Sequence, residues 1–220
     1  MSTLSKALRK AVAVFSPGER IVQAAKTGSL ATHRRLRGVR KVADQAAKRN
    51  LPGDFIECGV FKGGSAAVIS ERLWSTNPAK NTYLFDVFSG MPKPGENDPK
   101  EAWDDVGKFV SSPDLVRQTF TSCGLKTDRL HIHQGLFENT LPKFTPSPLC
   151  FLHVDCDWYE PVKMVLEKFY DHVVPGGTIV LDDYGHWSGC RKAFDEFAAA
   201  RGIKVVLTPI DYTSHYFLKP

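Results

Sequence analysis

The sequence lacks the apolar segments that a membrane protein or a secreted precursor needs. No apolar run approaches the roughly 20 residues that a helix requires to cross a bilayer. The apolar stretch near the N-terminus, AVAVF, is shorter than the core of a signal peptide. We therefore expect a protein of the cytoplasm that does not bind a membrane.

The sequence also lacks a cysteine pattern. Its five cysteines are odd in number, widely spaced and form no C-x-x-C pair, so neither a disulfide framework nor a zinc cage is indicated. Low-complexity tracts and internal repeats are absent too. With 42% hydrophobic and 24% charged residues, the composition is typical of a globular protein, and 220 residues suit one domain.

Acidic residues are scarce at the front of the chain. Residues 1–50 contain twelve Lys or Arg against Glu19 and Asp44, a balance of +10, which leaves −5 for residues 51–220. A basic surface of this kind would allow docking on nucleic acid or on anionic lipid, and the low acidity would also allow a transit peptide. We favour a solvated helical flap that does not bind nucleic acid.

The apolar spacing in this front part is helical. The first predicted helix has its apolar positions at Leu4, Leu8, Val12 and Phe15. The letters SPGE then break the pattern, and a second helix is predicted over residues 31–50. We expect residues 1–50 to pack as a flap or lid on a core domain over residues 51–220.

From residue 51 onward, short apolar runs alternate with helical patterns. This predicts a doubly wound α/β fold with a mostly parallel, seven-stranded sheet. The predicted strands cover residues 53–60, 81–88, 129–135, 148–157 and 176–185, and the predicted helices cover residues 63–75, 112–125, 160–174 and 189–202. Residues 203–210 and 214–220 can pair as an antiparallel hairpin at the sheet edge, and residues 92–112 form a polar insertion long enough for a mobile cover.

Acidic residues stand where four of the predicted strands end. In an open parallel sheet, ligands bind outside the carboxyl ends of the strands. Crowded carboxylates raise each other's pKa and destabilise a fold unless a cation or a ligand offsets them. We therefore predict that one site, with a metal ion, contains the acids at these ends: Glu57, Asp86, Asp155, Asp182 and Asp183.

A glycine-rich turn follows the first predicted strand. Gly59 and the Gly63-Gly64 pair allow the backbone to approach a ligand closely. The helix that begins near Ser65 presents free N–H groups there. The spacing is not the G-x-G-x-x-G of a dinucleotide site. Because Asp86 ends the neighbouring strand, where a carboxylate can accept ribose hydroxyls, we predict a nucleoside ligand, with Gln134 as an adenine contact.

Together these segments resemble the macrocin O-methyltransferase family over roughly residues 40–220. The resemblance depends on five motifs in conserved order and spacing: GDFIECGVFKGGSA, LFDVFSGMP, GLFENTLP, VDCDWYEP and LDDYGHWSGCRKAFDEF. It implies a class I methyltransferase fold, S-adenosylmethionine (SAM) as the methyl donor and Mg²⁺ in the site. By position, Asp155, Asp182 and Asp183 resemble the metal ligands, Asp157 resembles the general base, and the cofactor contacts correspond to Glu57, Gly59 and Asp86.

The chemistry can be argued beside the resemblance. An alcohol holds its proton too tightly at neutral pH, and Mg²⁺, which prefers oxygen ligands, would make the hydroxyl more acidic and fix its direction. Residues i and i+2 of a strand point to the same side, so Asp155 and Asp157 are predicted to reach the site while Cys156 points away. Asp157 is then the predicted base, and His186 is its competitor.

Several of these residues also have structural interpretations. The aspartates could cap the helices that follow them, and Asp157 could cap the helix near Tyr159. His153, His131 and His133 are interpreted as structural residues. Aromatic residues near the strand ends could line an acceptor pocket or simply pack together: Trp158, Tyr159 and Trp187.

Two other functions remain open at this point. The D-x-D in DCD is also a metal motif of nucleotide-sugar glycosyltransferases, and the basic front could belong to a non-enzymatic binding module. The favoured function is a SAM- and Mg²⁺-dependent O-methyltransferase. Its acceptor is expected to be a hydroxylated small molecule, a sugar or a glycosylated natural product, and a homodimer is an additional possibility.

Overall fold

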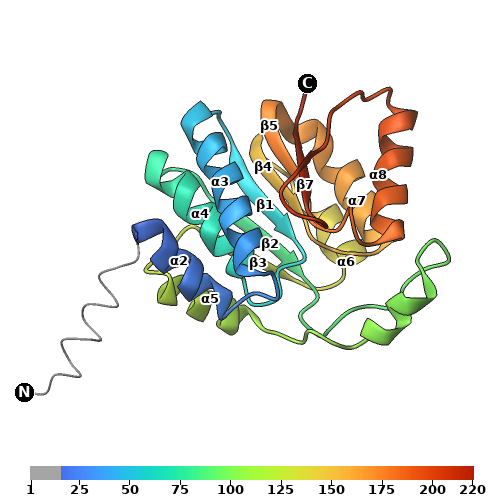
Figure 1. The fold of residues 1–220 in the computed structure, drawn as a ribbon, viewed down its shortest axis with the longest axis horizontal. Coiled ribbons are helices and arrows are strands. Elements are labelled where there is room, and N and C mark those ends of the chain that lie inside the picture. Colours follow the sequence, from blue (N-terminus) through green and yellow to red (C-terminus); the bar gives the residue numbers. More distant parts are fainter. Residues whose placement is uncertain (1–15) are drawn as a thin grey trace, which may run out of the picture.

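The computed structural model describes residues 16–220. The helix predicted over residues 4–15 lies outside the described residues. Within the described part of the chain, no helix is both long enough and apolar enough to cross a membrane. Figure 1 shows one central sheet with helices on both of its faces, which confirms the predicted doubly wound α/β architecture.

The sheet has seven strands in the order β3-β2-β1-β4-β5-β7-β6. The first five along the chain pair in parallel, and β7 is antiparallel to both β5 and β6. Their bounds are β1 Asp54–Cys58, β2 Thr82–Asp86, β3 Leu130–Gln134, β4 Leu149–Val154, β5 Val173–Leu181, β6 Thr208–Pro209 and β7 His215–Leu218. The strand order reverses between β1 and β4, which is where an open sheet of this kind binds its ligands.

The helices form two layers. On one face lie α2 (Pro17–Lys26), α3 (His33–Arg49), α4 (Gly64–Thr76) and α5 (Pro113–Ser122). On the other lie α7 (Tyr159–Phe169) and α8 (Ser188–Ala200), with the short α6 (Phe137–Thr140) nearby. Short 3-10 helices occupy Lys100–Asp105, Leu141–Lys143 and Tyr170–His172. Because β4 is covered on both sides, every one of its residues is buried, which explains its unbroken apolar run.

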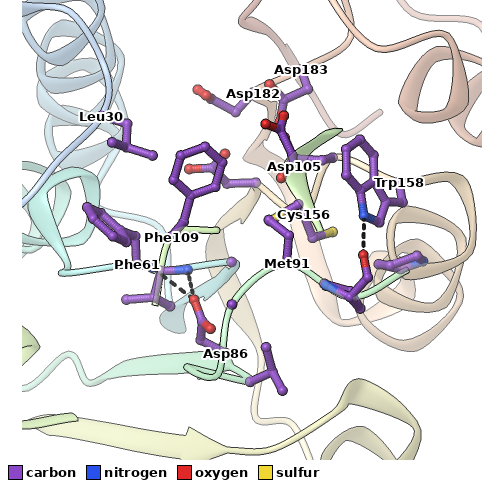
Figure 2. A pocket seen from close by; sticks show the side chains of 18 of the residues that line it. Leu30, Phe61, Asp86, Met91, Asp105, Phe109, Cys156, Trp158, Asp182 and Asp183 are labelled. Atoms are coloured by element: carbon purple, nitrogen blue, oxygen red, sulfur yellow. Dashed lines mark hydrogen bonds between the residues drawn. The ribbon is translucent and has the colours of Figure 1, made fainter. Parts of the chain in front are cut away.

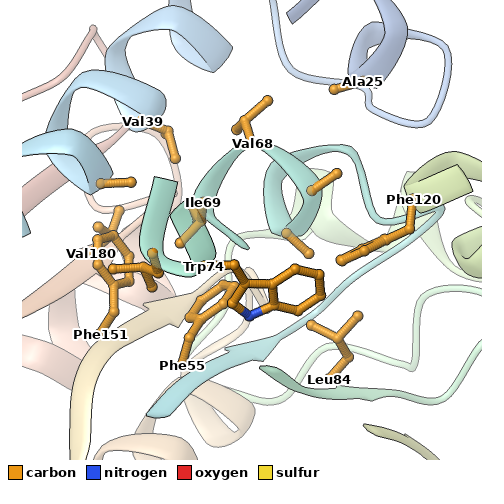
Figure 3. Packing of buried hydrophobic residues seen from close by; sticks show 14 of the residues in the cluster. Ala25, Val39, Phe55, Val68, Ile69, Trp74, Leu84, Phe120, Phe151 and Val180 are labelled. Carbon is orange, nitrogen blue, oxygen red and sulfur yellow. The ribbon is translucent and has the colours of Figure 1, made fainter. Parts of the chain in front are cut away.

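The N-terminal helices are part of the core. Val39 of α3 and Ala25 of α2 belong to the same buried cluster as Val68 of α4 and Phe55 of β1 (Figure 3). Burial of such an apolar stripe stabilises a helix far more than its intrinsic propensity does. The division of the chain at residue 51 into a flap and a methyltransferase domain stays a prediction, but α2 and α3 share one hydrophobic core with the sheet.

Three predicted boundaries are corrected by the structure. The letters SPGE, interpreted as a break, begin α2, because the Ser16 side chain accepts a hydrogen bond from the Glu19 N–H and Pro17 occupies the first turn. Strand β4 ends at Val154 and not at Asp157. The hairpin at the sheet edge is confirmed, but β6 is only two residues long.

Candidate active site

A cavity of about 550 Å³ opens at the carboxyl ends of β1 and β4. Its walls come from α3, the turn after β1, the end of β2, the residues after β4 and β5, and the insertion before α5. Figure 2 shows Asp182 and Asp183 at one end of the cavity and Asp86 at the other. The apolar lining includes Leu30, Phe61, Met91, Phe109 and Trp158.

Three aspartates meet at one end of this cavity. Asp155, Asp182 and Asp183 each offer a carboxylate oxygen, and these oxygens lie within 4.8 Å of one another. Asp155 follows β4, and the other two follow the neighbouring strand β5, so parallel pairing of β4 with β5 brings them together. We call these three residues the acid cluster.

Asp182 contacts two basic side chains. Its Oδ2 accepts a hydrogen bond of 2.8 Å from Nη1 of Arg35 on α3, and its Oδ1 lies 3.4 Å from Nε2 of His153. Burial alone would raise the pKa of Asp182, but His153 and Arg35 together lower it to about 2. Asp182 is therefore ionised throughout the neutral range.

The other two members of the acid cluster have fewer partners. Burial, with the neighbouring carboxylates adding to it, raises the pKa of both Asp155 and Asp183 well above the usual value. Oδ2 of Asp183 is buried and has no hydrogen-bond partner in the described structure. A buried oxygen without a partner, beside two further carboxylates, matches the donor set that a hard divalent cation binds.

Asp157 lies beside the acid cluster in a constrained backbone position. Its φ of 57° is in the left-handed region, and its Oδ1 accepts a hydrogen bond of 3.0 Å from Nε1 of Trp187. Burial and the charge of Asp182 raise the pKa of Asp157 to about 7. The alternation predicted for this segment is wrong, because the strand has already ended and Cys156 also lines the cavity (Figure 2).

The glycine turn after β1 is held by Asp86. Oδ2 of Asp86 accepts hydrogen bonds from the backbone N–H groups of Val60 and Phe61, and Oδ1 accepts one from Phe88. Phe61 and Phe88 have φ values of 51° and 59°, a conformation that a bulky side chain rarely adopts. A carboxylate has about four lone-pair sites, so three bonds leave about one for a ligand.

The glycines of the turn allow close packing of backbone. Gly59 has a φ of +84°, and a Cβ built on it would lie 1.6 Å from the carbonyl oxygen of Asp155. Gly63 caps α4 in the left-handed conformation, but it does not line the cavity. Gly64 and the buried Ser65, in the first turn of α4, do line it.

Three more of the predicted site residues do not line the cavity: Glu57, Gln134 and His186. Gln134 is exposed at the end of β3, although its neighbour Gly135 does line the cavity. His186 is exposed, and its ring packs against the edge of Trp187 at a centroid distance of 4.6 Å. Both lie at the rim of the site and not inside it.

Glu57 is fully buried behind the acid cluster. Its Oε1 lies 3.4 Å from Nδ1 of His153, whose other ring nitrogen faces Asp182. Burial raises the pKa of Glu57, whereas the pKa of His153, which burial alone would lower, is raised well above its usual value by Glu57 and Asp182. His153 is therefore a core residue as predicted, but one that connects Glu57 to the acid cluster.

The insertion lies against the site. Asp98 accepts hydrogen bonds of 2.8 Å from the backbone N–H groups of Tyr159 and Gly95, and the Trp158 indole donates to the Pro92 carbonyl. Trp158 and Trp187 line the cavity, whereas Tyr159 points to Glu196 and does not. Residues of the insertion thus complete the cavity wall, and their mobility stays a prediction.

Sequence reasoning missed several lining residues. Arg35, Asp98, Asp105 and Phe109 were not singled out, although all four line the cavity. Arg35 stands in a run of arginines that differ only in their helical phase, and the other three lie in an insertion without a regular pattern. No signal in the sequence distinguishes them from surface residues.

Comparisons with known proteins find relatives of this chain. A family model described as Macrocin-O-methyltransferase (TylF) matches residues 19–219. The chain is 30% identical over 190 residues to demethyldecarbamoylnovobiocin O-methyltransferase of Streptomyces niveus, a match covering 84% of this chain and 72% of that protein. It is 29% identical over 192 residues to mycinamicin III 3''-O-methyltransferase of Micromonospora griseorubida, with 84% and 75% covered.

Solved structures show the same architecture. The O-methyltransferase NovP superposes with a TM-score of 0.76 at 26% identity, covering 87% of this chain and 82% of that one. The calicheamicin methyltransferase CalS11 superposes with a TM-score of 0.63 at 17% identity, covering 92% and 91%, which is a likeness of fold alone.

Proposed function

This chain belongs to the macrocin O-methyltransferase family and is an O-methyltransferase, and we propose that it transfers a methyl group from SAM to a hydroxyl of a sugar or glycosylated natural product in a reaction that needs Mg²⁺. The observation that carries the metal part of the proposal is the acid cluster, whose oxygens lie within 4.8 Å of one another. The proposed acceptor class follows the names of the relatives, which are a demethyldecarbamoylnovobiocin O-methyltransferase and a mycinamicin III 3''-O-methyltransferase.

The acid cluster fits a hard divalent cation. Asp155, Asp182 and Asp183 supply only oxygen ligands, which Mg²⁺ prefers, and the unpartnered oxygen of Asp183 has no other role in the described structure. When bound, a divalent cation here would make the acceptor hydroxyl more acidic and fix its direction. The three residues would hold that cation at the carboxyl ends of β4 and β5.

The opposite end of the cavity fits a nucleoside. Asp86 has about one lone-pair site free after its three backbone bonds, enough to accept one ribose hydroxyl. Gly59 and Ser65 border the same space, and so does Gly64, the first residue of α4. Glu57 would act on the cofactor only indirectly, because it does not reach the cavity.

Asp157 is the proposed general base. It lines the cavity beside the acid cluster, and its contact with Trp187 fixes the direction of its carboxylate. A base must lie within hydrogen-bond reach of the proton it removes, and a residue already inside the cavity meets this condition better than the exposed His186 at its rim. Holding donor, acceptor and base in one cavity supplies much of the rate by itself.

The family membership leaves little support for the other two functions. A nucleotide-sugar glycosyltransferase would use the DCD motif but would not need Asp182 and Asp183 beside it. A basic binding module would not need an acid-lined cavity, and α3 buries its apolar face in the core. A location in the cytoplasm, a homodimer, and a boundary at residue 51 stay predictions.

Calorimetry tests the proposal most directly. We expect the full chain to bind SAM, and Mg²⁺ to be required for methyl transfer to a hydroxylated glycoside. Asp182→Asn should abolish Mg²⁺-dependent turnover and leave the fold and most of the SAM affinity intact, whereas Asp128→Asn on the exposed surface should change neither. Full activity of Asp182→Asn would remove the metal hypothesis, and absence of SAM binding would remove the whole proposal.

A further inference from the structure

Arg35 is a cation held among the acids of the active site. It lies on α3, more than a hundred residues before the acid cluster in the chain, and lines the cavity. Its Nη1 donates to Oδ2 of Asp182 at 2.8 Å, and its Nε donates to Oδ2 of Asp211 at 2.9 Å. The side chain is only 18% exposed, so the two ion pairs are poorly screened by water.

The position of Arg35 is fixed from the side away from the cluster. Asp211 lies in the turn before β7, and its Oδ1 accepts hydrogen bonds from the N–H groups of Thr213 and Ser214. The guanidinium is planar and bonds in two directions at once, which a lysine ammonium cannot reproduce in the same geometry. Arg35 therefore connects α3, the C-terminal turn and the acid cluster.

The charge balance of the cluster depends on this residue. Among residues 16–220, the basic side chains that contact the acid cluster are Arg35 and His153, and His153 also faces Glu57. Lys93 is the only other lysine or arginine in the described cavity wall, and it has no ion pair with the cluster in that part of the chain. Without Arg35, two buried carboxylates and the half-buried Asp155 would repel one another, and only His153, which is shared with Glu57, would offset them.

We infer that Arg35 is the resident counter-ion of the acid cluster: it stabilises the metal-free protein and competes electrostatically with the divalent cation for Asp182. This rests on the proposed metal site. A cation held by Asp182 and its neighbours would be repelled by a guanidinium that contacts the same carboxylate. Metal binding is then linked, through Arg35 and Asp211, to the contact between α3 and the C-terminal turn.

The inference predicts two opposite effects of removing the charge. Arg35→Met should melt at a temperature lower by about 5 °C than the unchanged protein in EDTA, because the carboxylates lose their counter-ion. The same variant should bind Mg²⁺ about tenfold more tightly, since two charges a few ångströms apart interact strongly at a partly buried site. Arg35→Lys keeps the charge, so it should bind Mg²⁺ like the unchanged protein and lose only stability.

Mg²⁺ binding to the full chain, measured by calorimetry without SAM, and melting in EDTA provide the test. Arg40→Met is the matched control, because Arg40 is also on α3, is 21% exposed and is paired with Glu71 away from the cavity. It should leave the Mg²⁺ affinity unchanged. If Arg35→Met binds Mg²⁺ as tightly as the unchanged protein or more weakly, the inference is overturned, while the proposed metal site is still supported. If the unchanged protein binds no Mg²⁺, the proposed metal site fails, and the inference fails with it.

A measurement on the unchanged protein avoids the risk that Arg35→Met does not fold. The Nε–H signal of Arg35, identified by its loss in Arg35→Lys, can be followed by nuclear magnetic resonance during Mg²⁺ addition. We expect Mg²⁺ addition to shift this signal, because Nη1 of the same guanidinium loses its hydrogen bond to Asp182 while Nε stays bonded to Asp211. A signal unaffected by saturating Mg²⁺ would contradict the competition.

Discussion

The indole Nε1 of Trp187 donates a hydrogen bond to Oδ1 of Asp157 across 3.0 Å. This contact fixes a carboxylate whose backbone is in the left-handed region, at the point where the chain leaves β4 and enters α7. Asp157 is thereby held in the cavity beside the acid cluster. This geometry suits the proposed role of Asp157 as general base, because a carboxylate already directed into the cavity does not have to be ordered when the acceptor arrives.

Replacing Asp157 by Asn should therefore lower kcat by about 100-fold to 10,000-fold, the range for loss of a general base. Asn keeps the oxygen that Trp187 contacts and tolerates a positive φ well, so the fold and the affinity for SAM should be retained. Steady-state kinetics and SAM calorimetry on the same preparation separate the two effects.

His186→Asn is the companion variant, since His186 is the other base that the sequence allows. Its ring is exposed at the rim, so we expect kcat to change by less than about threefold. A large loss in His186→Asn together with normal turnover in Asp157→Asn would exchange the two roles.

Asp86→Asn should weaken SAM binding and loosen the turn after β1. The carboxylate accepts three backbone hydrogen bonds, two of them from Phe61 and Phe88, whose positive φ values are strained. An amide has a single acceptor oxygen, so at least one N–H loses its partner, at a cost of about 1–3 kcal/mol. Calorimetry should show at least about tenfold weaker SAM binding, while Asp128→Asn at the surface should leave it unchanged.

The general position of the site could be predicted from the sequence, because a buried parallel strand shows itself as an apolar run and the residues after it are then at the carboxyl edge. Asp155, Asp182 and Asp183 were placed in this way, and the structure brings them together. Proximity of strand ends depends only on which strands are parallel neighbours. It does not require knowledge of side-chain conformation.

Contacts that depend on helix phase or on turn conformation could not be predicted. Arg35 is one of several arginines on α3, and only its orientation toward the sheet gives it Asp182 and Asp211 as partners. The alternation expected for Cys156 failed because the strand ended two residues earlier, at Val154. Pro17 was interpreted as a break, although proline is also favoured in the first turn of a helix, where α2 has it.

Gly59→Ala should severely destabilise the protein. The added Cβ would lie 1.6 Å from the carbonyl oxygen of Asp155, and that oxygen belongs to backbone that cannot move without disturbing the acid cluster.

Gly124→Ala is the matched control, because Gly124 also has a positive φ, +74°, but nothing lies within 4 Å of its Cβ. Urea unfolding should show a loss of about 1–2 kcal/mol for Gly124→Ala, from backbone strain alone, and a clearly larger loss or no folded protein for Gly59→Ala. Equal losses would mean that the close contact with Asp155 is easily relieved.

Asp98→Ala should detach the insertion from the cavity. Asp98 accepts hydrogen bonds from the N–H of Tyr159, in the first turn of α7, and from Gly95 within the insertion, and α7 has no side-chain cap from Trp158 at its own start. Losing such a cap costs about 1 kcal/mol, so the protein should stay folded. The insertion, which also supplies Asp105 and Phe109 to the cavity wall, should become more accessible to protease, and the KM for the acceptor should rise more than the dissociation constant of SAM. Asp98→Asn retains an acceptor oxygen, so its proteolysis rate and its KM for the acceptor should lie between those of the unchanged protein and those of Asp98→Ala.

An unchanged proteolysis rate in Asp98→Ala would mean that the other contacts of the insertion, such as that from Trp158 to Pro92, are sufficient to hold it in place.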